Sequence, residues 1–381
     1  MHDFIVNVIR QALAEQRLVG VEVMINHHGK TVFHSASGFA DRENQRQMER
    51  HTLFRLASVS KPIVTTAAMV LVKKGVLDLD TSVSHYLPVF SPRLAEGRAA
   101  SPTLRQLMSH TSGLGYRFLE ESADGPYARA GVSDGMDSSA LTLVENMQRI
   151  ASVPLLFPPG TAWCYSLGID VLGAVIEQVQ GQRLDKAVKT LVTDPLGMHA
   201  TDFFASPEQQ VAVAYVNDQP QPHPLEEGEY VAPFENTVGV CYSPARVFNP
   251  QAYPSGGAGM VGTVSDFMHL LETLRIGGGE ILSEQWVAEM GRDQIAPLEI
   301  PNAPGVGFGL GFSVLRDPHS ALSPESPGTW RWGGAYGHAW FVDRAQELSV
   351  VAFSNTLYEG MSGQFVNDLR DAVYRGIEGM K

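Results

Sequence analysis

A serine and a lysine three positions apart, Ser58 and Lys61, are the residues of this sequence best spaced to do chemistry. They lie in FRLASVSKP, where an apolar run ends and a helical pattern begins that continues to a stop at residues 73–75 (KKG). Residues three apart on a helix share one face, so the Lys61 ammonium can reach Ser58 Oγ. Free N–H groups at the helix start would stabilise negative charge near the serine, and Pro62 suits a first turn. The alternative for this spacing is a capping serine followed by a solvated lysine.

Tyr165 is a second candidate, because it follows a rigid Pro-Pro-Gly turn and stands just before a predicted helix. Its segment, FPPGTAWCYSLG (157–168), leads into apolar residues at helical spacing from Ile169 onward. A phenol has an ordinary pKa of about 10 and is a poor base at neutral pH, but a neighbouring ammonium would lower that value. The alternative is a half-buried tyrosine with a structural hydrogen bond.

The third candidate is the segment WRWGGAYGHAWFVD (330–343), in which Gly333 and Gly334 interrupt strand-like sequence. Paired glycines within a strand usually mark the close approach of another backbone or a ligand. Such an edge can supply a backbone N–H to an oxyanion. The alternative is a bulged hairpin that binds nothing.

In this order, the three segments resemble the serine β-lactamase and penicillin-binding-protein superfamily, especially class C β-lactamases and the family VIII-type carboxylesterases of the same fold. The superfamily motifs Ser-x-x-Lys, Tyr-x-Asn and Lys-Thr-Gly fall on residues 58–61, 165–167 and 332–334. Connecting segments resemble further landmarks of the superfamily: LRQLMSHTSGL (104–114), DPLGM (194–198), SGGAGM (255–260) and GFGLGF (307–312).

Two departures from the family motifs bear on the substrate. Leu167 stands where the family has asparagine, and Trp332 stands where it has lysine. Both changes remove polar groups that recognise β-lactams or D-alanyl peptides, and a site without such groups loses affinity for those substrates. The variant motifs resemble those of the carboxylesterases, so we expect an esterase acting on a small ester. A β-lactamase or D-alanyl carboxypeptidase is the alternative, with Arg331 or His338 supplying the missing groups.

The resemblance implies two-step acyl transfer. Ser58 attacks the ester carbonyl while Lys61 and Tyr165 share the task of accepting its proton, in coupled titrations. The backbone N–H groups of Ser58 and Ala335 hold the oxyanion. No cofactor is expected, and an acyltransferase would use the same residues, whereas a non-catalytic binding module would not need them. The expected substrate-binding residues are Trp332, Gly333, Gly334, Leu167 and Tyr116.

A competing esterase motif is GVSDG at residues 131–135, which matches the Gly-x-Ser-x-Gly elbow of α/β-hydrolases. That elbow works on a sharp turn between a strand and a helix. Here it lies in polar, glycine-rich sequence with no strand ahead of it. We therefore expect a loop, and Ser133 is not our nucleophile.

Composition is that of a globular enzyme. The net charge of −13 disfavours nucleic acid or an anionic membrane as a partner, and no apolar run is long enough to span a membrane. The 12 histidines form no metal-binding motif, and two cysteines give no disulfide pattern. The N-terminus lacks the features of a signal peptide, which predicts a cytoplasmic protein. The sequence leaves the oligomeric state open.

The element pattern and the resemblance predict an α+β fold, with an antiparallel sheet flanked by helices, built from both chain ends, and an inserted, mainly helical subdomain. We assign residues 1–74 and 255–381 to the sheet subdomain and 75–254 to the helical one, with the site in the cleft between them. The expected elements are a hairpin around residues 28–29, strands at 309–314, 330–332, 339–342 and 348–353, a surface loop at 220–233, an N-terminal helix with Phe4, Ile5, Val8, Ile9 and Leu13 on one side, and a final helix with Phe365, Leu369, Val373 and Ile377 on one side.

Overall fold

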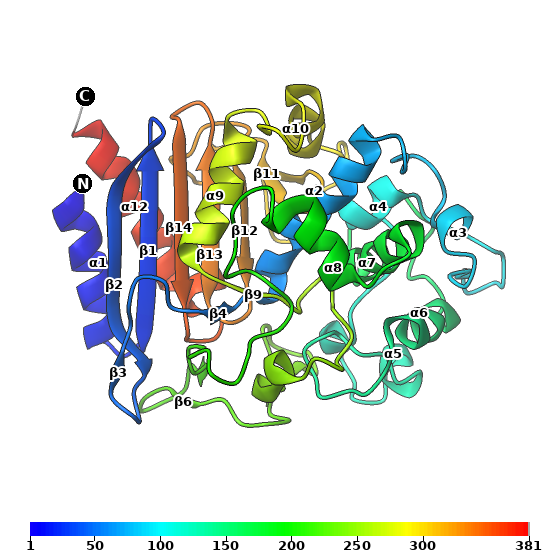
Figure 1. Cartoon of the computed structure of the whole chain (residues 1–381), viewed down its shortest axis with the longest axis horizontal. Helices are drawn as coiled ribbons and strands as arrows, with labels where there is room; N and C mark the ends of the chain where they lie inside the picture. Colours follow the sequence, from blue (N-terminus) through cyan, green and yellow to red (C-terminus); the bar gives the residue numbers. More distant parts are fainter. Residues whose placement is uncertain (380–381) are drawn as a thin grey trace.

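Strands from both ends of the chain form one eight-stranded antiparallel sheet in the computed structural model, which describes residues 1–379. β1 pairs with β2 on one side and with β14, from the far end of the chain, on the other. The order across the sheet is β10-β11-β12-β13-β14-β1-β2-β3 (Figure 1), and it confirms the predicted fold class. The bounds are β1 (Gly20–His27), β2 (Lys30–Asp41), β3 (Arg46–Gln47), β10 (Val306–Phe308), β11 (Ser313–Leu315), β12 (Trp330–Gly334), β13 (His338–Asp343) and β14 (Leu348–Ser354).

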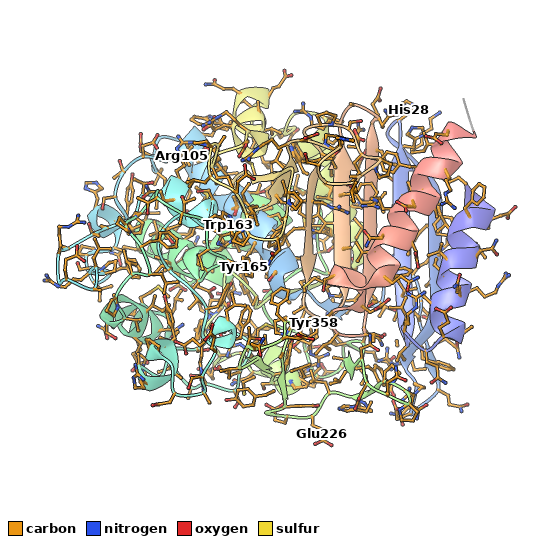
Figure 2. All side chains as sticks on the ribbon, turned by 180° about the vertical axis from the view of Figure 1, so that it is seen from behind. His28, Arg105, Trp163, Tyr165, Glu226 and Tyr358 are labelled. Carbon is orange, nitrogen blue, oxygen red and sulfur yellow. The ribbon has the colours of Figure 1, made fainter. Side chains whose placement is uncertain are left out.

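Helices α1 (His2–Ala14) and α12 (Gln364–Glu378) pack together on one face of the sheet, and α12 crosses in front of the strands in Figure 2. One side of each helix is apolar, so burying that side builds a core separate from the one on the opposite face. The four apolar residues predicted to face inward from the final helix are all buried. The prediction was wrong at Phe4, which is 49% exposed, and Ala12 is buried on α1 instead.

The opposite face of the sheet is covered by α9 (Val264–Arg275), with α2 (Ser60–Lys73) between the sheet and the helices of the middle region, residues 75–254 (Figure 1). Nearly every residue of α2 is buried, so this helix is the centre of the main core. It ends where predicted, and Gly75 follows with φ +70°. The other helices are α3 (Val83–Tyr86), α4 (Leu104–Met108), α5 (Pro126–Arg129), α6 (Leu143–Ser152), α7 (Gly168–Gln180), α8 (Leu184–Val188), α10 (Glu284–Gly291) and α11 (Glu359–Ser362).

A single strand over residues 309–314 was expected, but the structure has a turn between β10 and β11. Gly311 adopts φ +90°, and its N–H donates to Met108 O in α4 rather than to a neighbouring strand. A side chain at Gly309 would collide with Met290 O. The alternating glycines therefore form a turn and a close contact, although their spacing resembles that of a strand.

The region from 75 to 254 combines short helices, long loops and four two-residue strands, β5 (Tyr215–Val216), β6 (His223–Pro224), β7 (Tyr230–Val231) and β8 (Val240–Cys241). The expected loop at 220–233 carries β6 and part of the β7–β8 hairpin. Both cysteines are free thiols. Within residues 1–379, no helix has the length and apolar character needed to cross a bilayer.

Candidate active site

Ser58 lies in a single 3-10 turn, η1 (Ala57–Val59), that leads directly into α2. Ala57 adopts φ +45°, an unfavourable conformation for a residue with a side chain, and such strain is common at functional sites. Leu56 N–H donates to Met260 O at 2.8 Å, which fixes the start of the turn. Ser58 is partly exposed although the residues on both sides of it are buried, so its hydroxyl is accessible to a small molecule.

Three side chains meet at the Ser58 hydroxyl. Ser58 Oγ lies 2.6 Å from Tyr165 OH, and Lys61 Nζ donates to it at 3.0 Å. Lys61 comes from the first turn of α2, and Tyr165 comes from the loop directly before α7. Figure 2 shows the Tyr165 side chain near the edge of the sheet. A phenol and a cation within hydrogen-bond reach of one hydroxyl form the kind of arrangement that activates a serine for nucleophilic attack.

The Lys61 ammonium is completely enclosed, with 0% of the residue exposed. Besides Ser58, it donates to Gly257 O at 2.9 Å. It also lies 4.6 Å from the centre of the Tyr165 ring and 5.4 Å from that of Tyr116, where a cation is attracted to the ring faces. These contacts therefore hold the ammonium at Ser58. A solvated lysine after a capping serine, the alternative considered from the sequence, would instead extend into solvent.

A buried acidic residue, Asp170, contacts the loop that accepts a hydrogen bond from Lys61. Asp170, in the first turn of α7, accepts a hydrogen bond from Ser255 Oγ at 2.5 Å. A Cβ on Gly257 would lie 2.4 Å from Asp170 Oδ2, so the loop can approach only with glycine at this position. Burial raises the pKa of Asp170, and the nearby Lys61 ammonium opposes that rise. Asp170 thus anchors the loop whose carbonyl accepts from Lys61.

The β12–β13 hairpin packs directly on the Ser58 turn. A Cβ on Gly334 would lie 2.5 Å from Leu56 O, so a larger residue would push the hairpin away. Ala335 follows at the hairpin turn, and its carbonyl accepts the N–H of Tyr358 at 3.0 Å. No acceptor for the Ala335 N–H is found within residues 1–379. That N–H is therefore free to donate to a ligand beside Ser58.

Aromatic side chains form one wall around Tyr165. The Trp332 ring is partly exposed and lies 5.4 Å from the Tyr165 ring and 5.2 Å from the Phe308 ring. Tyr116 is only 3% exposed, and its ring lies 5.0 Å from that of Tyr165. Burial raises the pKa of Tyr116 well above its ordinary value, so its hydroxyl stays protonated. Trp332 offers a ligand apolar surface, whereas Tyr116 mainly supports Tyr165 and Lys61.

The prediction that Leu167 lines the substrate pocket was wrong. Leu167 is 0% exposed and packs in the main core at the start of α7. Its N–H donates to Gly115 O, and its side chain is enclosed by the core and presents no surface to a ligand. Gly333 and Gly334 are also buried, and a Cβ on Gly333 would lie 2.6 Å from His338 O. The two glycines allow close backbone packing and present no side chain to a substrate.

Arg331 and His338, the groups considered as replacements for the missing polar residues, are both engaged elsewhere. Arg331 pairs with the buried Glu325 at 3.2 Å, and alternation along β12 turns it to the face opposite Trp332. His338 is fully buried, and its Nε2 donates to Arg55 O at 2.7 Å. Neither side chain is placed to hold a substrate carboxylate.

Ser133 lies in a loop with no preceding strand, as expected from the sequence. It is 1% exposed, and its hydroxyl donates to Asp137 Oδ1 at 2.7 Å and accepts from Tyr253 OH at 3.0 Å. Among residues 1–379, no histidine hydrogen-bonds to this hydroxyl. The motif therefore has the sequence of an esterase elbow and the structure of a buried turn.

Sequence reasoning assigned no role to several residues that contact the site, namely His110, Asp170, Gly257 and Phe308. His110, Gly257 and Phe308 fall inside segments that resemble family landmarks, so those matches were the available indication. Asp170 stands inside an apolar helix and had no comparable indication. Within residues 1–379, no group of three histidine, cysteine or acidic side chains is arranged to hold a metal ion.

A serine joined to a lysine one helical turn away and to a tyrosine, at the junction of an antiparallel sheet with a helical region, defines the β-lactamase class of serine hydrolase folds. The chain belongs to that family: the model of the Beta-lactamase family matches residues 5–375.

Similar proteins include enzymes with named activities. Esterase EstB of Burkholderia gladioli is 48% identical over 368 residues, which cover 96% of this chain and 93% of EstB. The solved structure of EstCE1, described as a hydrolase with promiscuous acyltransferase activity, is 44% identical with a TM-score of 0.95, covering 98% of both chains. Monacolin J acid methylbutanoyltransferase of Aspergillus terreus is 26% identical over 332 residues, covering 78% of this chain and 76% of that protein.

Proposed function

We propose that this protein is a carboxylesterase that hydrolyses small, uncharged esters through an acyl-enzyme on Ser58. The observation that carries the proposal is the pair of hydrogen bonds that join Lys61 and Tyr165 to Ser58 Oγ, beside the partly exposed Trp332. The similarity to esterase EstB supports the same reaction class.

In the proposed reaction, Ser58 Oγ attacks the ester carbonyl and passes its proton to the unit formed by Lys61 and Tyr165. Lys61 Nζ and Tyr165 OH both hydrogen-bond Ser58 Oγ, so the proton passes into a hydrogen-bonded unit and not to one isolated base. The N–H groups of Ser58 and Ala335 stabilise the oxyanion. Tyr165 returns a proton to the leaving alkoxide, and water then releases the acid.

The substrate class follows from the polar groups that the pocket lacks. Trp332 provides apolar surface where the family lysine would provide a cation, and Leu167, Arg331 and His338 supply nothing in its place. A penicillin would bring a carboxylate and an amide into this pocket unpaired, at about 1–3 kcal/mol for each group. A neutral ester carries neither group and avoids both costs.

The nucleophile is tested with Ser58→Ala, and Ser133→Ala is the matched control. We expect Ser58→Ala to abolish hydrolysis of p-nitrophenyl butyrate with the fold intact, and Ser133→Ala to change kcat by less than about threefold. Peptide mapping after a fluorophosphonate probe should place the adduct on Ser58. An adduct on Ser133, with the effects of the two variants reversed, would replace this proposal by an α/β-hydrolase mechanism.

The substrate class is tested by steady-state assays on a single preparation. We expect kcat/KM for p-nitrophenyl acetate or butyrate to exceed that for nitrocefin or benzylpenicillin at least about 100-fold, equivalent to about 2.7 kcal/mol. The basis is the loss of two polar contacts in the pocket. Comparable efficiency on an ester and a cephalosporin would refute the esterase assignment in favour of a β-lactamase.

Acyl transfer to an alcohol is the second candidate function, favoured by the acyltransferase activity described for EstCE1. The same acyl-enzyme would then react with an alcohol in place of water. Adding increasing methanol to a vinyl ester assay and separating methyl ester from free acid measures the partition. Transfer is supported if the ester-to-acid ratio exceeds the methanol-to-water ratio, and excluded if acid alone forms.

A further inference from the structure

His110 accepts two hydrogen bonds from the loop that carries Tyr165. Its backbone carbonyl accepts the N–H of Cys164 at 2.9 Å, and its ring Nδ1 accepts the N–H of Ser166 at 3.2 Å. These are the residues immediately before and after Tyr165 in the chain. The His110 ring itself packs against the Tyr165 ring, with 4.8 Å between their centres.

The protonation state of the ring is defined by its partners. A backbone N–H can only donate, so Nδ1 of His110 must carry its lone pair to accept from Ser166. The Ser166 hydroxyl lies 3.0 Å from the same nitrogen, and since Nδ1 has no proton to give, the hydroxyl is the donor of that bond while it accepts from the Gly168 N–H. Nε2 then carries the ring proton, and it is buried with no hydrogen-bond partner in the described structure.

An imidazolium would break this arrangement, because a proton on Nδ1 would face the N–H of Ser166, which can only donate. Burial, and secondarily the Lys61 ammonium, holds the pKa of His110 well below its ordinary value. Tyr165 is the other titratable side chain packed against the ring. The ring is therefore neutral near pH 7.

We infer that His110 is a positioning residue, whose neutral imidazole accepts from Ser166 and thereby fixes the Tyr165 phenol at Ser58 Oγ. The inference rests on the proposed function of Tyr165. His110 is not a proton carrier in it, since its Nδ1 faces Ser166 and no bond links the ring to Ser58 or Lys61. Small misplacements of a catalytic group cost on the order of 100-fold in rate, so loss of this acceptor should appear in kcat.

Two substitutions at His110 distinguish the role of the hydrogen-bond acceptor from that of the aromatic ring. The residue has φ +57°, which asparagine and glycine tolerate. His110→Asn places an amide oxygen near the position of Nδ1, whereas His110→Gly adopts the same backbone without an acceptor. We expect His110→Gly to lower kcat about 100-fold with KM changed less than about threefold, and His110→Asn to keep at least about tenfold more kcat than His110→Gly. The exposed His85→Asn serves as the control.

The shape of the pH–kcat profile distinguishes positioning from proton transfer. His110→Asn should keep the wild-type profile at reduced height, because no titrating group has been lost. If His110→Asn is as slow as His110→Gly, or if it removes a limb of the profile, the inference is wrong. Hydrolysis that survives Ser58→Ala would instead refute the proposed function and leave the His110 geometry standing.

A spectroscopic measurement on the wild-type protein decides the matter even if both His110 variants fail to fold. Nitrogen-15 histidine labelling distinguishes the two neutral tautomers and the imidazolium, and comparison with Tyr165→Phe, which perturbs the adjacent ring, identifies the His110 signals. We expect a bare Nδ1 and a protonated Nε2 throughout pH 6–9. A proton on Nδ1 anywhere in that range would overturn the inference.

Discussion

The hydroxyl of Ser58 accepts from an ammonium and bonds a phenol at the same time, so a proton leaving it enters a shared unit. Lys61 and Tyr165 bond the same oxygen, so removing either residue changes the hydrogen bonding around the other. The enclosed Lys61 has no solvent to replace a lost partner. The energetic consequence is strong non-additivity.

We therefore predict that Lys61→Ala and Tyr165→Phe each lower kcat by about 10²–10⁴, and that the double variant is only slightly slower than the slower single one. Steady-state rates for the four proteins, with circular dichroism to check the fold, measure the coupling. Losses that add fully in log kcat would show that the two residues act independently.

At the scale of single residues, the sequence was sufficient where spacing determines geometry. Lys61 reaches Ser58 because both lie on one helical turn. Tyr165 is 107 positions from Ser58, so its place at the same hydroxyl was predicted by the family resemblance and not by spacing. Leu167 could not be placed in this way, since its burial depends on packing against core residues that are distant in sequence. Asp170 was missed for the same reason, because its partner Ser255 belongs to another segment.

Among the elements, the β12–β13 hairpin is joined to the Ser58 turn by contact at Gly334 and by the bond from His338 to Arg55 O. The free N–H of Ala335 is thereby held at a fixed place relative to Ser58. Paired glycines in a strand indicated a close approach from sequence alone, but not what approached. The turn at 309–312 shows the opposite case, where alternating glycines were misjudged as strand because their partner, Met108, was unknown.

Gly334→Ala tests whether this contact matters to catalysis. The new Cβ would lie 2.5 Å from Leu56 O, so the hairpin must move away from Ser58 and take the Ala335 N–H with it. Removing one oxyanion donor costs about 10²–10³ in kcat, and we expect a loss in that range with little change in KM. Wild-type kcat in a folded Gly334→Ala protein would show that Ala335 does not hold the oxyanion.

His338 of the same hairpin should make the free energy of unfolding depend on pH. Burial lowers the pKa of His338 to about 4, from about 6.5 in the unfolded chain. The unfolded state therefore binds the proton first as pH falls, so the stability that neutral His338 contributes is present above pH 6.5 and is lost between about pH 6.5 and 4. Urea unfolding of wild type should lose about 2–3 kcal/mol more between pH 7 and 4.5 than His338→Gln, whose amide can still donate to Arg55 O. Equal losses in the two proteins would contradict this.

For the whole molecule, the two largest cores lie on opposite faces of one sheet. The core around α2 contacts the site, and so does a smaller cluster that contains Ala57 and packs against Ala335. The core under α1 and α12 contributes stability without touching Ser58. Hydrophobic spacing in the two terminal helices was enough to predict this layer, apart from Phe4. Which strands pair could not be read from spacing, because every apolar strand is an equally good neighbour until register and connections are known.

We expect Leu369→Ala to lower the free energy of unfolding without lowering kcat. Leu369 is 3% exposed in the core between α12 and the sheet, so truncation should cost about 2–5 kcal/mol of unfolding free energy. At temperatures where the variant is folded, kcat should stay within about twofold of wild type. The exposed Asn367→Ala on the same helix should change stability by less than about 0.5 kcal/mol. A large fall in kcat for folded Leu369→Ala would show that the two cores are coupled.

The pairing of β1 with β14 also determines when the chain can fold during synthesis. Residues 20–27 leave the ribosome more than 300 residues before their partner, residues 348–354. At about 5–20 residues per second, the open edge of the β1–β2 hairpin waits on the order of 20 to 60 s for its neighbour. During that interval Val21, Val23 and Ile25 have no sheet to enter and no helix α12 to cover them. The nascent chain therefore passes through a stage in which an unpaired, apolar strand edge is exposed, and factors that bind such edges have their longest opportunity at the N-terminal hairpin.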